Sequence, residues 1–460
     1  MRAPVDPDAA DAQDAAHAMV IGLGKPQRAG ETGGSARRLE CSVTSAVSTL
    51  AGGSRLPAVS FLARLPAALC PTGTLLVVTA RSGIGTAGLV AGALWVGQAI
   101  GGPLIGRLSD RRGQHAVVLT AALSNAVALL LLVAAVLTDR PPALQAACSA
   151  LAGLTVPQIG PLSRSRWVRL AEQRADGQGL IGAALSMDAT LDEISFVAGP
   201  ALAGLLAFTL PPVSGLLLAA ALIAVFGTLF ALHPSGSPAV AASRTPAGPP
   251  PPLPPVLRPL LALALLQGMF FGSANAGVNA MAASDPGVAG LVWATMGVSS
   301  ALVGLLVTAR PGPLPLPSRL RRSLAVQAVL APGLLLVHTP SAAALVLVLV
   351  GTAVAPTLIA LFSLAASRAP AQRMAEVMTW LGSALIIGQG LAAVAAGQLA
   401  HRFGCTASFG LSCAATVLAL VVVLLSRIPA PGPPPPRPVA GPAASGSRGP
   451  TPSKAQKASE

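Results

Sequence analysis

The amino-acid sequence predicts an all-α integral membrane protein with twelve transmembrane helices in two six-helix halves. Three observations predict this fold class. Hydrophobic residues make up 53% of the 460 residues and charged residues only 10%, and the mean hydropathy is +0.69. A water-soluble globule needs more polar surface than this composition supplies. Apolar runs of the roughly 20 residues that a membrane span requires recur along the chain, and a proline-rich interval divides them into two sets.

The first 55 residues contain spaced aspartates and Gly/Arg-rich sequence without a continuous apolar run. We expect residues 1–55 to form a disordered cytoplasmic extension. No basic segment leads into a short apolar region with a cleavage site, so we expect no signal peptide and assign the insertion signal to the first span.

The two halves are predicted from the order of the apolar runs. Residues 56–233 form the first half, with runs at 56–79, 84–106, 116–137, 142–162, 180–209 and 211–233. Residues 234–258 include four consecutive prolines and predict a cytoplasmic, polyproline-like linker. Residues 259–428 form the second half, with runs at 259–281, 287–308, 322–338, 341–366, 374–400 and 405–427. The Pro-rich residues 429–460 predict a disordered cytoplasmic tail.

The net charge of +14 comes mainly from arginines, and these are concentrated in alternate loops. This asymmetry follows the positive-inside rule and places both termini in the cytoplasm. Because the arginines lie in short loops between spans, the basic composition does not indicate nucleic-acid binding. The arginines assigned to the cytoplasmic loops are Arg107, Arg111, Arg112, Arg164, Arg166, Arg169, Arg174, Arg310, Arg319, Arg321, Arg322, Arg368 and Arg373.

The loop after the second apolar run carries a specific motif. Gly106, Asp110, Arg111 and Gly113 form the pattern G-x-x-x-D-R-x-G. This loop resembles the one that joins spans two and three in the major facilitator superfamily. The resemblance implies the two-by-six fold, alternating access and a role for Asp110 as a conformational latch at the cytoplasmic end of another span. The alternative is that the basic residues of the loop only determine topology.

The fifth span contains acidic residues close to a Gly-Pro pair. Gly199 and Pro200 remove a backbone donor within the span and favour a kink. They resemble the Gly-Pro signature of the superfamily's proton-coupled antiporters, although Ala203-Gly204 replaces the usual Gly-Gly pair. Asp192 and Glu193 precede the kink at a depth where an acid is costly unless it is paired, protonated or hydrated. We predict that one of them titrates during transport; the alternative is a structural salt bridge.

Two further polar groups are candidate substrate contacts. Arg64 in span one is expected at the depth of Asp192 and is its predicted partner, unless its side chain extends to the headgroups. Gln267, Asn275 and Asn279 fall near one face of span seven. In the superfamily's plan, spans one and seven line the central cavity, so these amides either bind substrate or hold helices together.

The sequence contains no hydrolase, metalloprotease or nucleotide-binding motif, and its five cysteines and five histidines are dispersed. We therefore predict neither an enzyme nor a metal or other cofactor. The tyrosine-free, arginine-rich composition is typical of high-G+C bacteria. Together these observations, with the resemblance to bacterial efflux permeases, predict a multi-pass transporter of the bacterial inner (plasma) membrane that exports a small organic compound in exchange for protons. Its partners would be that compound, protons and the lipid bilayer. A uniporter or nutrient importer of the same fold, and a membrane sensor or scaffold that transports nothing, are the alternatives.

Overall fold

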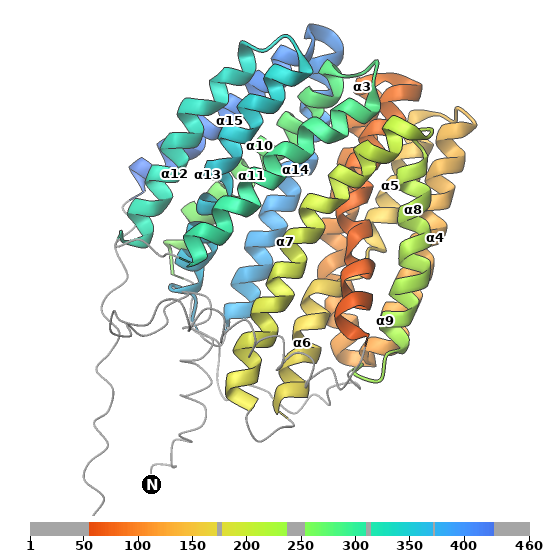
Figure 1. Cartoon of the computed structure of the whole chain (residues 1–460), viewed down its shortest axis with the longest axis vertical. Coiled ribbons are helices and arrows are strands. Elements are labelled where there is room, and N and C mark those ends of the chain that lie inside the picture. The colour runs from red at the N-terminus through yellow and green to blue at the C-terminus, as the bar shows by residue number, and fades with distance from the viewer. Residues whose placement is uncertain (1–54, 173–176, 237–253, 310–313, 371–372, 427–460) are drawn as a thin grey trace, which may run out of the picture.

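The computed structural model describes residues 55–172, 177–236, 254–309, 314–370 and 373–426, and all of the regular structure in these ranges is helical (Figure 1). The predicted N-terminal extension up to residue 54, most of the linker and the predicted tail lie outside the described residues, as do Arg174 and Arg310.

The first half contains seven α-helices and one π-helical turn. α8, η1 and α9 follow one another without a gap, so they form one rod. The elements are α3 (Leu56–Arg112), α4 (Gln114–Leu137), α5 (Pro142–Leu154), α6 (Ile159–Glu172), α7 (Gly177–Thr209), α8 (Ser214–Leu222), η1 (Ile223–Gly227) and α9 (Thr228–Leu232).

The described part of the second half consists of α-helices and one 3₁₀ segment, η2. This segment directly follows α12 and contains a proline. The elements are α10 (Leu257–Met281), α11 (Pro286–Ala309), α12 (Leu316–Leu330), η2 (Ala331–Leu335), α13 (Pro340–Ala366), α14 (Met374–Phe403) and α15 (Cys405–Leu425).

α3 accounts for the first two apolar runs together. Its 57 residues would extend about 85 Å at 1.5 Å per residue, whereas the hydrocarbon core of a bilayer is about 30 Å thick. The helical geometry is interrupted at Gly83, where φ is 79° and ψ is 166°. A positive φ is strained for residues other than glycine, so Gly83 provides the turn between two spans. Among the described residues, nine helices, α3 included, are long and apolar enough to cross a membrane.

The fourth apolar run differs from its predicted form. Residues 142–162 are not one helix, because α5 ends at Leu154 and α6 begins at Ile159. Pro157 lies in the break and has no N–H with which to continue a helix. The prediction that the basic residues lie in loops is wrong for nine arginines, all of which are helical. They are Arg107, Arg111 and Arg112 in α3, Arg164, Arg166 and Arg169 in α6, and Arg319, Arg321 and Arg322 in α12.

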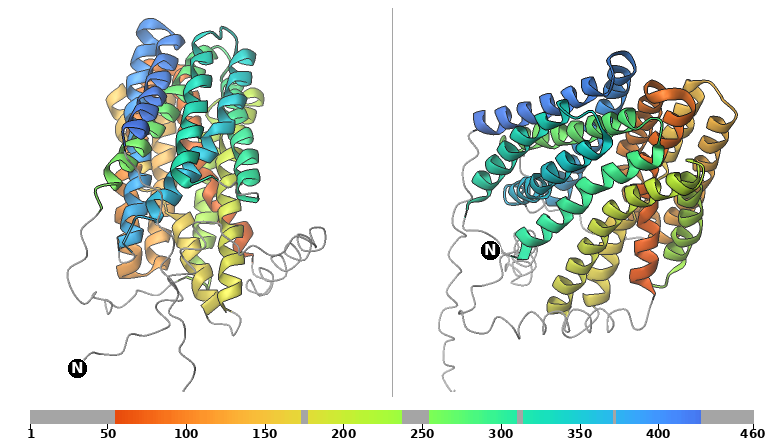
Figure 2. Two further views of the ribbon diagram at one scale, coloured as in Figure 1. Left: turned by 90° about the vertical axis from the view of Figure 1, so that its left-hand side faces the viewer. Right: turned by 45° about the horizontal axis from the view of Figure 1, so that its top comes forward.

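The two halves meet along two glycine-rich helix crossings. We call the end of the molecule with Gly83 and the α14–α15 turn at Gly404 the far end, and the opposite end, with Leu56 and Leu257, the terminal end (Figures 1 and 2). In the first crossing α3 contacts α14, and a Cβ added at Gly88 would lie 2.4 Å from the Ala393 carbonyl oxygen.

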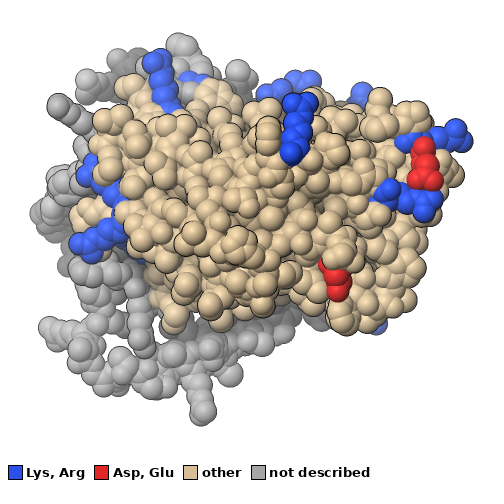
Figure 3. Space-filling model, turned by 90° about the horizontal axis from the view of Figure 1, so that it is seen from above, with Lys and Arg blue, Asp and Glu red and all other residues tan. Residues whose placement is uncertain are grey.

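In the second crossing α7 contacts α11. A Cβ added at Gly204 would lie 2.8 Å from the Gly290 Cα, and one added at Gly287 would lie 2.6 Å from the Phe208 Cα. Small residues allow helix backbones to approach this closely in a bilayer. These contacts lie on the far-end side of the four helices, so the halves are sealed there. Figure 3, which views the molecule from above, shows a mainly uncharged surface with a few charged side chains.

Candidate functional site

A cluster of four charged side chains joins α3, α6 and α7 within the first half. Arg64 Nη2 lies 2.5 Å from Asp188 Oδ1, and Arg64 Nη1 lies 3.1 Å from Asp192 Oδ1. Arg164 Nε lies 3.4 Å from Asp188 Oδ2, and Arg164 Nη2 also contacts Asp192 Oδ2. Each acid therefore contacts both arginines, and the cluster has no net charge.

The acids of the cluster lie in different environments. Asp188 is fully buried, whereas the Asp192 side chain is 21% exposed. Asp188 also accepts a hydrogen bond from Ser163 Oγ at 2.7 Å, and Arg64 Nη1 donates to the Asp188 carbonyl oxygen at 3.0 Å. Removing one partner from a buried ion pair leaves an uncompensated charge at high cost. Asp188 is therefore suited to holding Arg64 in place, and Asp192 is the acid that water can reach.

The arrangement follows from local geometry. Asp188 and Asp192 are four residues apart, so they lie on the same face of α7. Arg164 is in the second turn of α6, and the break between α5 and α6 allows that helix to start beside α7.

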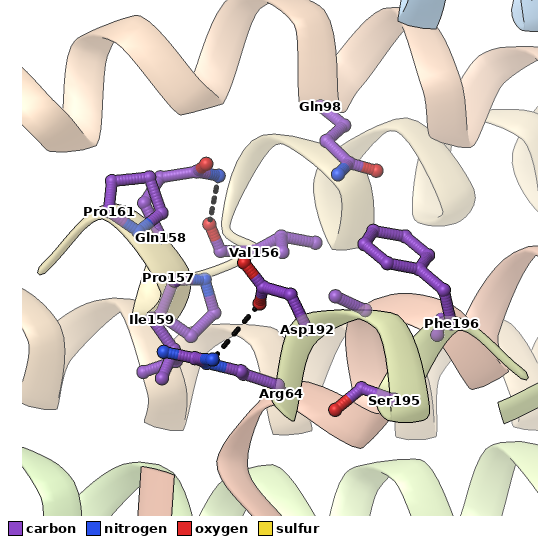
Figure 4. Close-up of a pocket in the computed structure, with 13 residues that line it drawn as sticks. Arg64, Gln98, Val156, Pro157, Gln158, Ile159, Pro161, Asp192, Ser195 and Phe196 are labelled. Carbon is purple, nitrogen blue, oxygen red and sulfur yellow. Dashed lines mark hydrogen bonds and ion pairs between the residues drawn. The ribbon is translucent and has the colours of Figure 1, made fainter. Parts of the chain in front are cut away.

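A pocket of about 150 Å³ adjoins the cluster (Figure 4). Its charged lining consists of Arg64 and Asp192, and Gln98, Gln158 and Ser195 add polar groups. The rest of the lining consists of the first residues of α6 and apolar side chains, namely Ala67, Ala68, Val156, Pro157, Ile159, Gly160, Pro161 and Phe196.

The structure brings together some of the predicted site residues. Arg64 and Asp192, which the sequence places at similar depth, are in direct contact. Glu193 is in α7, but its side chain lies outside the described residues. Sequence reasoning did not identify Asp188 as the main partner of Arg64, nor Arg164 as the second cation. The four-residue spacing of the two aspartates was the available signal for Asp188.

The predicted polar stripe of the seventh span is in α10, away from this pocket. Gln267 and Asn279 are each 2% exposed and Asn275 is 8% exposed. Asn279 Nδ2 donates to the Asn275 carbonyl oxygen at 2.8 Å and to Asn275 Oδ1 at 2.9 Å. No residue of the stripe is part of the pocket lining beside the charge cluster, so any contact of theirs with substrate stays a prediction.

The predicted motif loop is mostly helical: Gly106, Asp110 and Arg111 lie in the last turns of α3, and Gly113 alone forms the turn between α3 and α4. Gly113 has a φ of 88°, which explains a glycine at this position, and Gly106 has no neighbouring atom within 4 Å of where a Cβ would lie. Asp110 and Arg111 are exposed, and within the described ranges Asp110 forms no ion pair. The proposed latch contact of Asp110 is therefore not formed with the described residues in this conformation.

The Gly-Pro pair lies at a close helix contact. α7 continues through Pro200 without interruption from Gly177 to Thr209. A Cβ added at Gly199 would lie 2.6 Å from the Ala68 Cβ, so the glycine allows α7 to pack against α3. The pair thus sets the helix separation one to two turns from Asp192.

Arg166 has a packing role in addition to its predicted topological one. It is fully buried; its Nε donates to Gln114 Oε1 at 2.9 Å and its Nη1 to the Phe230 carbonyl oxygen at 2.6 Å. The guanidinium carbon lies 3.7 Å from the centre of the Phe230 ring. Arg166 therefore ties α6 to the start of α4 and to the end of α9. Beyond α9, burial lowers the pKa of His233, and the neighbouring Arg166 lowers it further.

Comparisons with known proteins give one family match and several structures of similar fold. The sequence profile of the Major Facilitator Superfamily matches residues 58–385. A search of curated proteins found no match. Solved structures that resemble this one include the nucleoside transporter NupG, with 15% identity, a TM-score of 0.64 and coverage of 80% of this chain and 98% of that chain.

Two further solved structures are similar. A bacterial homologue of the iron transporter ferroportin in an inward-facing state has 19% identity and a TM-score of 0.59, covering 80% of this chain and 98% of that chain. The human organic anion transporter MFSD10 (TETRAN) has 19% identity and a TM-score of 0.53, covering 80% of this chain and 99% of that chain. At these identities the likeness shows a shared fold.

Proposed function

Because the chain belongs to the major facilitator superfamily of transporters, we propose that it is a secondary transporter that works by alternating access. It exports a small organic compound, and this transport is coupled to protons through Asp192. In this proposal the compound binds between the halves, and rocking of the halves exposes it to one side of the membrane at a time.

The observation that carries the proposal is the exposure of Asp192 to the pocket. Its carboxylate contacts Arg64 and Arg164, which belong to two different helices, while its side chain retains 21% exposure. A proton arriving through the pocket would neutralise this acid and weaken both ion pairs. Because the pairs join α7 to α3 and α6, their loss would change the relative stability of the inward-open and outward-open states.

The packing of the halves supports a rocking motion. The close glycine contacts lie on the far-end side of α3, α7, α11 and α14, and at the terminal end Asp110 forms no ion pair with a described residue. A conformation sealed at one end and unlatched at the other is one of the two states that alternating access requires. With the arginine-rich loops assigned to the cytoplasm, we place the terminal end inside a bacterial cell, in the inner membrane, and this conformation faces inward.

The test is a transport assay in liposomes that contain the purified full-length protein and a pH-sensitive dye. An outward-directed proton gradient is set, and nucleosides, organic anions, peptides and amines are added in turn. We expect one class of compound to change the internal pH in the wild-type protein and not in Asp192→Asn.

Asp139→Asn is the matched control, because Asp139 pairs with Arg81 at the exposed far end, and we expect it to transport like wild type. Equal proton coupling in Asp192→Asn and wild type would refute a coupling role for Asp192. Compound flux without proton movement would identify a uniporter, and absence of flux for every compound would favour a sensor or scaffold.

A further inference from the structure

The break between α5 and α6 places the N-terminus of α6 at the pocket. Five consecutive residues, 157–161, line it, and they include the first three residues of the 14-residue α6. The first turn of a helix has N–H groups without intrahelical acceptors and carries partial positive charge. Among the described residues, the Gly160 N–H donates to no backbone acceptor, and Pro161 has no N–H.

A second, independent feature makes the same wall of the pocket positive. Arg64 lines the pocket, is 5% exposed, and its Nη1 lies 3.1 Å from Asp192 Oδ1, the carboxylate that also lines the pocket. Across the pocket, Gln98 extends its amide into the space and forms no hydrogen bond with a described residue (Figure 4). A guanidinium whose acid partner faces the pocket and an unengaged amide are groups that a ligand with hydrogen-bond acceptors could contact.

The protein's own carboxylate already occupies this positive region. A Cβ added at Gly160 would lie 3.3 Å from Asp192 Oδ1 and 3.4 Å from Asp192 Oδ2, so the acid sits against the first turn of α6. The carboxylate contacts Arg64 and Arg164 and is near Asp188 on its own helix. These are the charged groups that face Asp192 from α3, α6 and α7 within the described residues.

We propose that the pocket binds the carboxylate of a small organic anion, which takes the place of the Asp192 carboxylate at Arg64 and the N-terminus of α6. Phe196, 65% exposed, and the apolar Val156 and Pro157 would contact the carbon skeleton of the ligand. Apolar cavities of about 150 Å³ bind benzene, so the pocket volume of about 150 Å³ suits a short or narrow carboxylate. The transport part of this inference rests on the proposed function; the binding part does not.

The exchange of carboxylates determines the sense of coupling. The Asp192 carboxylate competes with the ligand for Arg64, and a proton bound to Asp192 removes that competitor. The proton therefore strengthens anion binding and, by linkage, the anion strengthens proton binding. The loaded carrier holds one proton and one monoanion, so the two cross the membrane together. An inward proton gradient would then drive uptake of the anion, and in this respect the inference replaces the export in exchange for protons that the sequence predicts.

The experiment is calorimetric titration of the full-length protein in nanodiscs at pH 6 and pH 7.5. Butyrate and benzoate are the probes, and butyramide and butylamine are the neutral and cationic controls. Both acids are ionised at either pH, so a change in affinity reports on the protein. We expect the carboxylates to bind more tightly at pH 6 than at pH 7.5, and the amide and amine to bind at least about tenfold more weakly than butyrate.

Two variants separate the anion site from a general packing effect. Asp192→Asn mimics the protonated acid and should bind the carboxylates at both pH values as tightly as wild type does at pH 6 or more tightly. Gly160→Ala places a methyl group at the first turn of α6 and should weaken binding about tenfold. Gly410→Ala, at a helical glycine with no atom within 4 Å of the added Cβ, is the matched control and should bind like wild type.

The proposal is overturned if neither carboxylate binds at pH 6, if butyramide binds as tightly as butyrate, or if Asp192→Asn weakens binding. The dye assay in liposomes gives the independent result for transport. Binding with the expected pattern but no flux would refute the proposed function and leave the anion site standing. Proton-coupled flux of other compounds without carboxylate binding would refute the anion site and leave the proposed function standing.

Discussion

Asp188→Asn tests the division of the charge cluster into a structural acid and a titrating acid. The substitution keeps the shape of the side chain and removes its charge. The fully buried residue 188 would lose its ion pairs with Arg64, now at 2.5 Å, and with Arg164, now at 3.4 Å. Breaking a buried ion pair costs about 3–5 kcal/mol. Because Asp192 still faces Arg64, we expect the lower end of that range, about 3 kcal/mol. For Asp192→Asn, whose partly exposed side chain keeps water contact, we expect about 1 kcal/mol.

The assay is reversible unfolding in mixed micelles of increasing denaturing detergent, followed by helical circular dichroism. Asp110→Asn is the control, since Asp110 is exposed and forms no ion pair with a described residue; its unfolding free energy should stay within about 0.5 kcal/mol of wild type. The reasoning fails if Asp188→Asn is as stable as the control, or if Asp192→Asn is the more destabilised of the two aspartate variants.

Three further predictions concern a helix crossing, a buried arginine and a histidine outside the pocket. Gly88→Leu should prevent the far end from closing, because its Cβ would lie 2.4 Å from a backbone oxygen of α14, whereas Gly106→Leu, the control, should not. The measurement is the distance between spin labels placed on the two halves at the far end. A distance in Gly88→Leu equal to that in wild type would contradict the prediction. Arg166→Lys preserves the charge but loses the several N–H donors of the guanidinium, so we expect the unfolding free energy in detergent to fall by about 2–3 kcal/mol. If the variant is as stable as wild type, Arg166 acts only as a topology determinant. The pKa of His233 is lowered in the folded protein, mainly by burial, so its stabilising contribution is full above its unfolded pKa of about 6.5 and declines as the pH falls through the folded value. His233→Gln should therefore lessen the fall in melting temperature between pH 7.5 and pH 5, and an identical fall would exclude this residue as its source.

Much of the fold follows from hydropathy alone. Each of the twelve predicted apolar runs overlaps at least one helix, because the need to satisfy backbone hydrogen bonds in lipid leaves little choice of structure. The break between Leu154 and Ile159 was not predicted. Pro157 was visible, but a proline can kink a span without ending it, and the groups that stabilise a break come from other helices.

The site was harder to predict than the fold, because its contacts join residues far apart in the chain. Arg64 and Asp188 are separated by 124 positions, and depth along a span indicates neither the rotation of a helix nor which of two acids faces an arginine. Arg164 was assigned to a loop because charge near a span end is typical of loops. The position of Arg164 in the second turn of α6 becomes apparent only once the helix is known to begin at Ile159.

The glycine crossings at the far end also bear on how the halves would separate. In the described part of the chain, one side-chain hydrogen bond joins the halves there, from Gln398 Nε2 to the Gly85 carbonyl oxygen at 3.0 Å, and every ion pair lies within one half. Separating the halves therefore breaks mainly dispersion contacts between backbones. Mobile ions screen charges and leave dispersion unaffected. We therefore expect the rate at which the halves separate at this end to be insensitive to ionic strength.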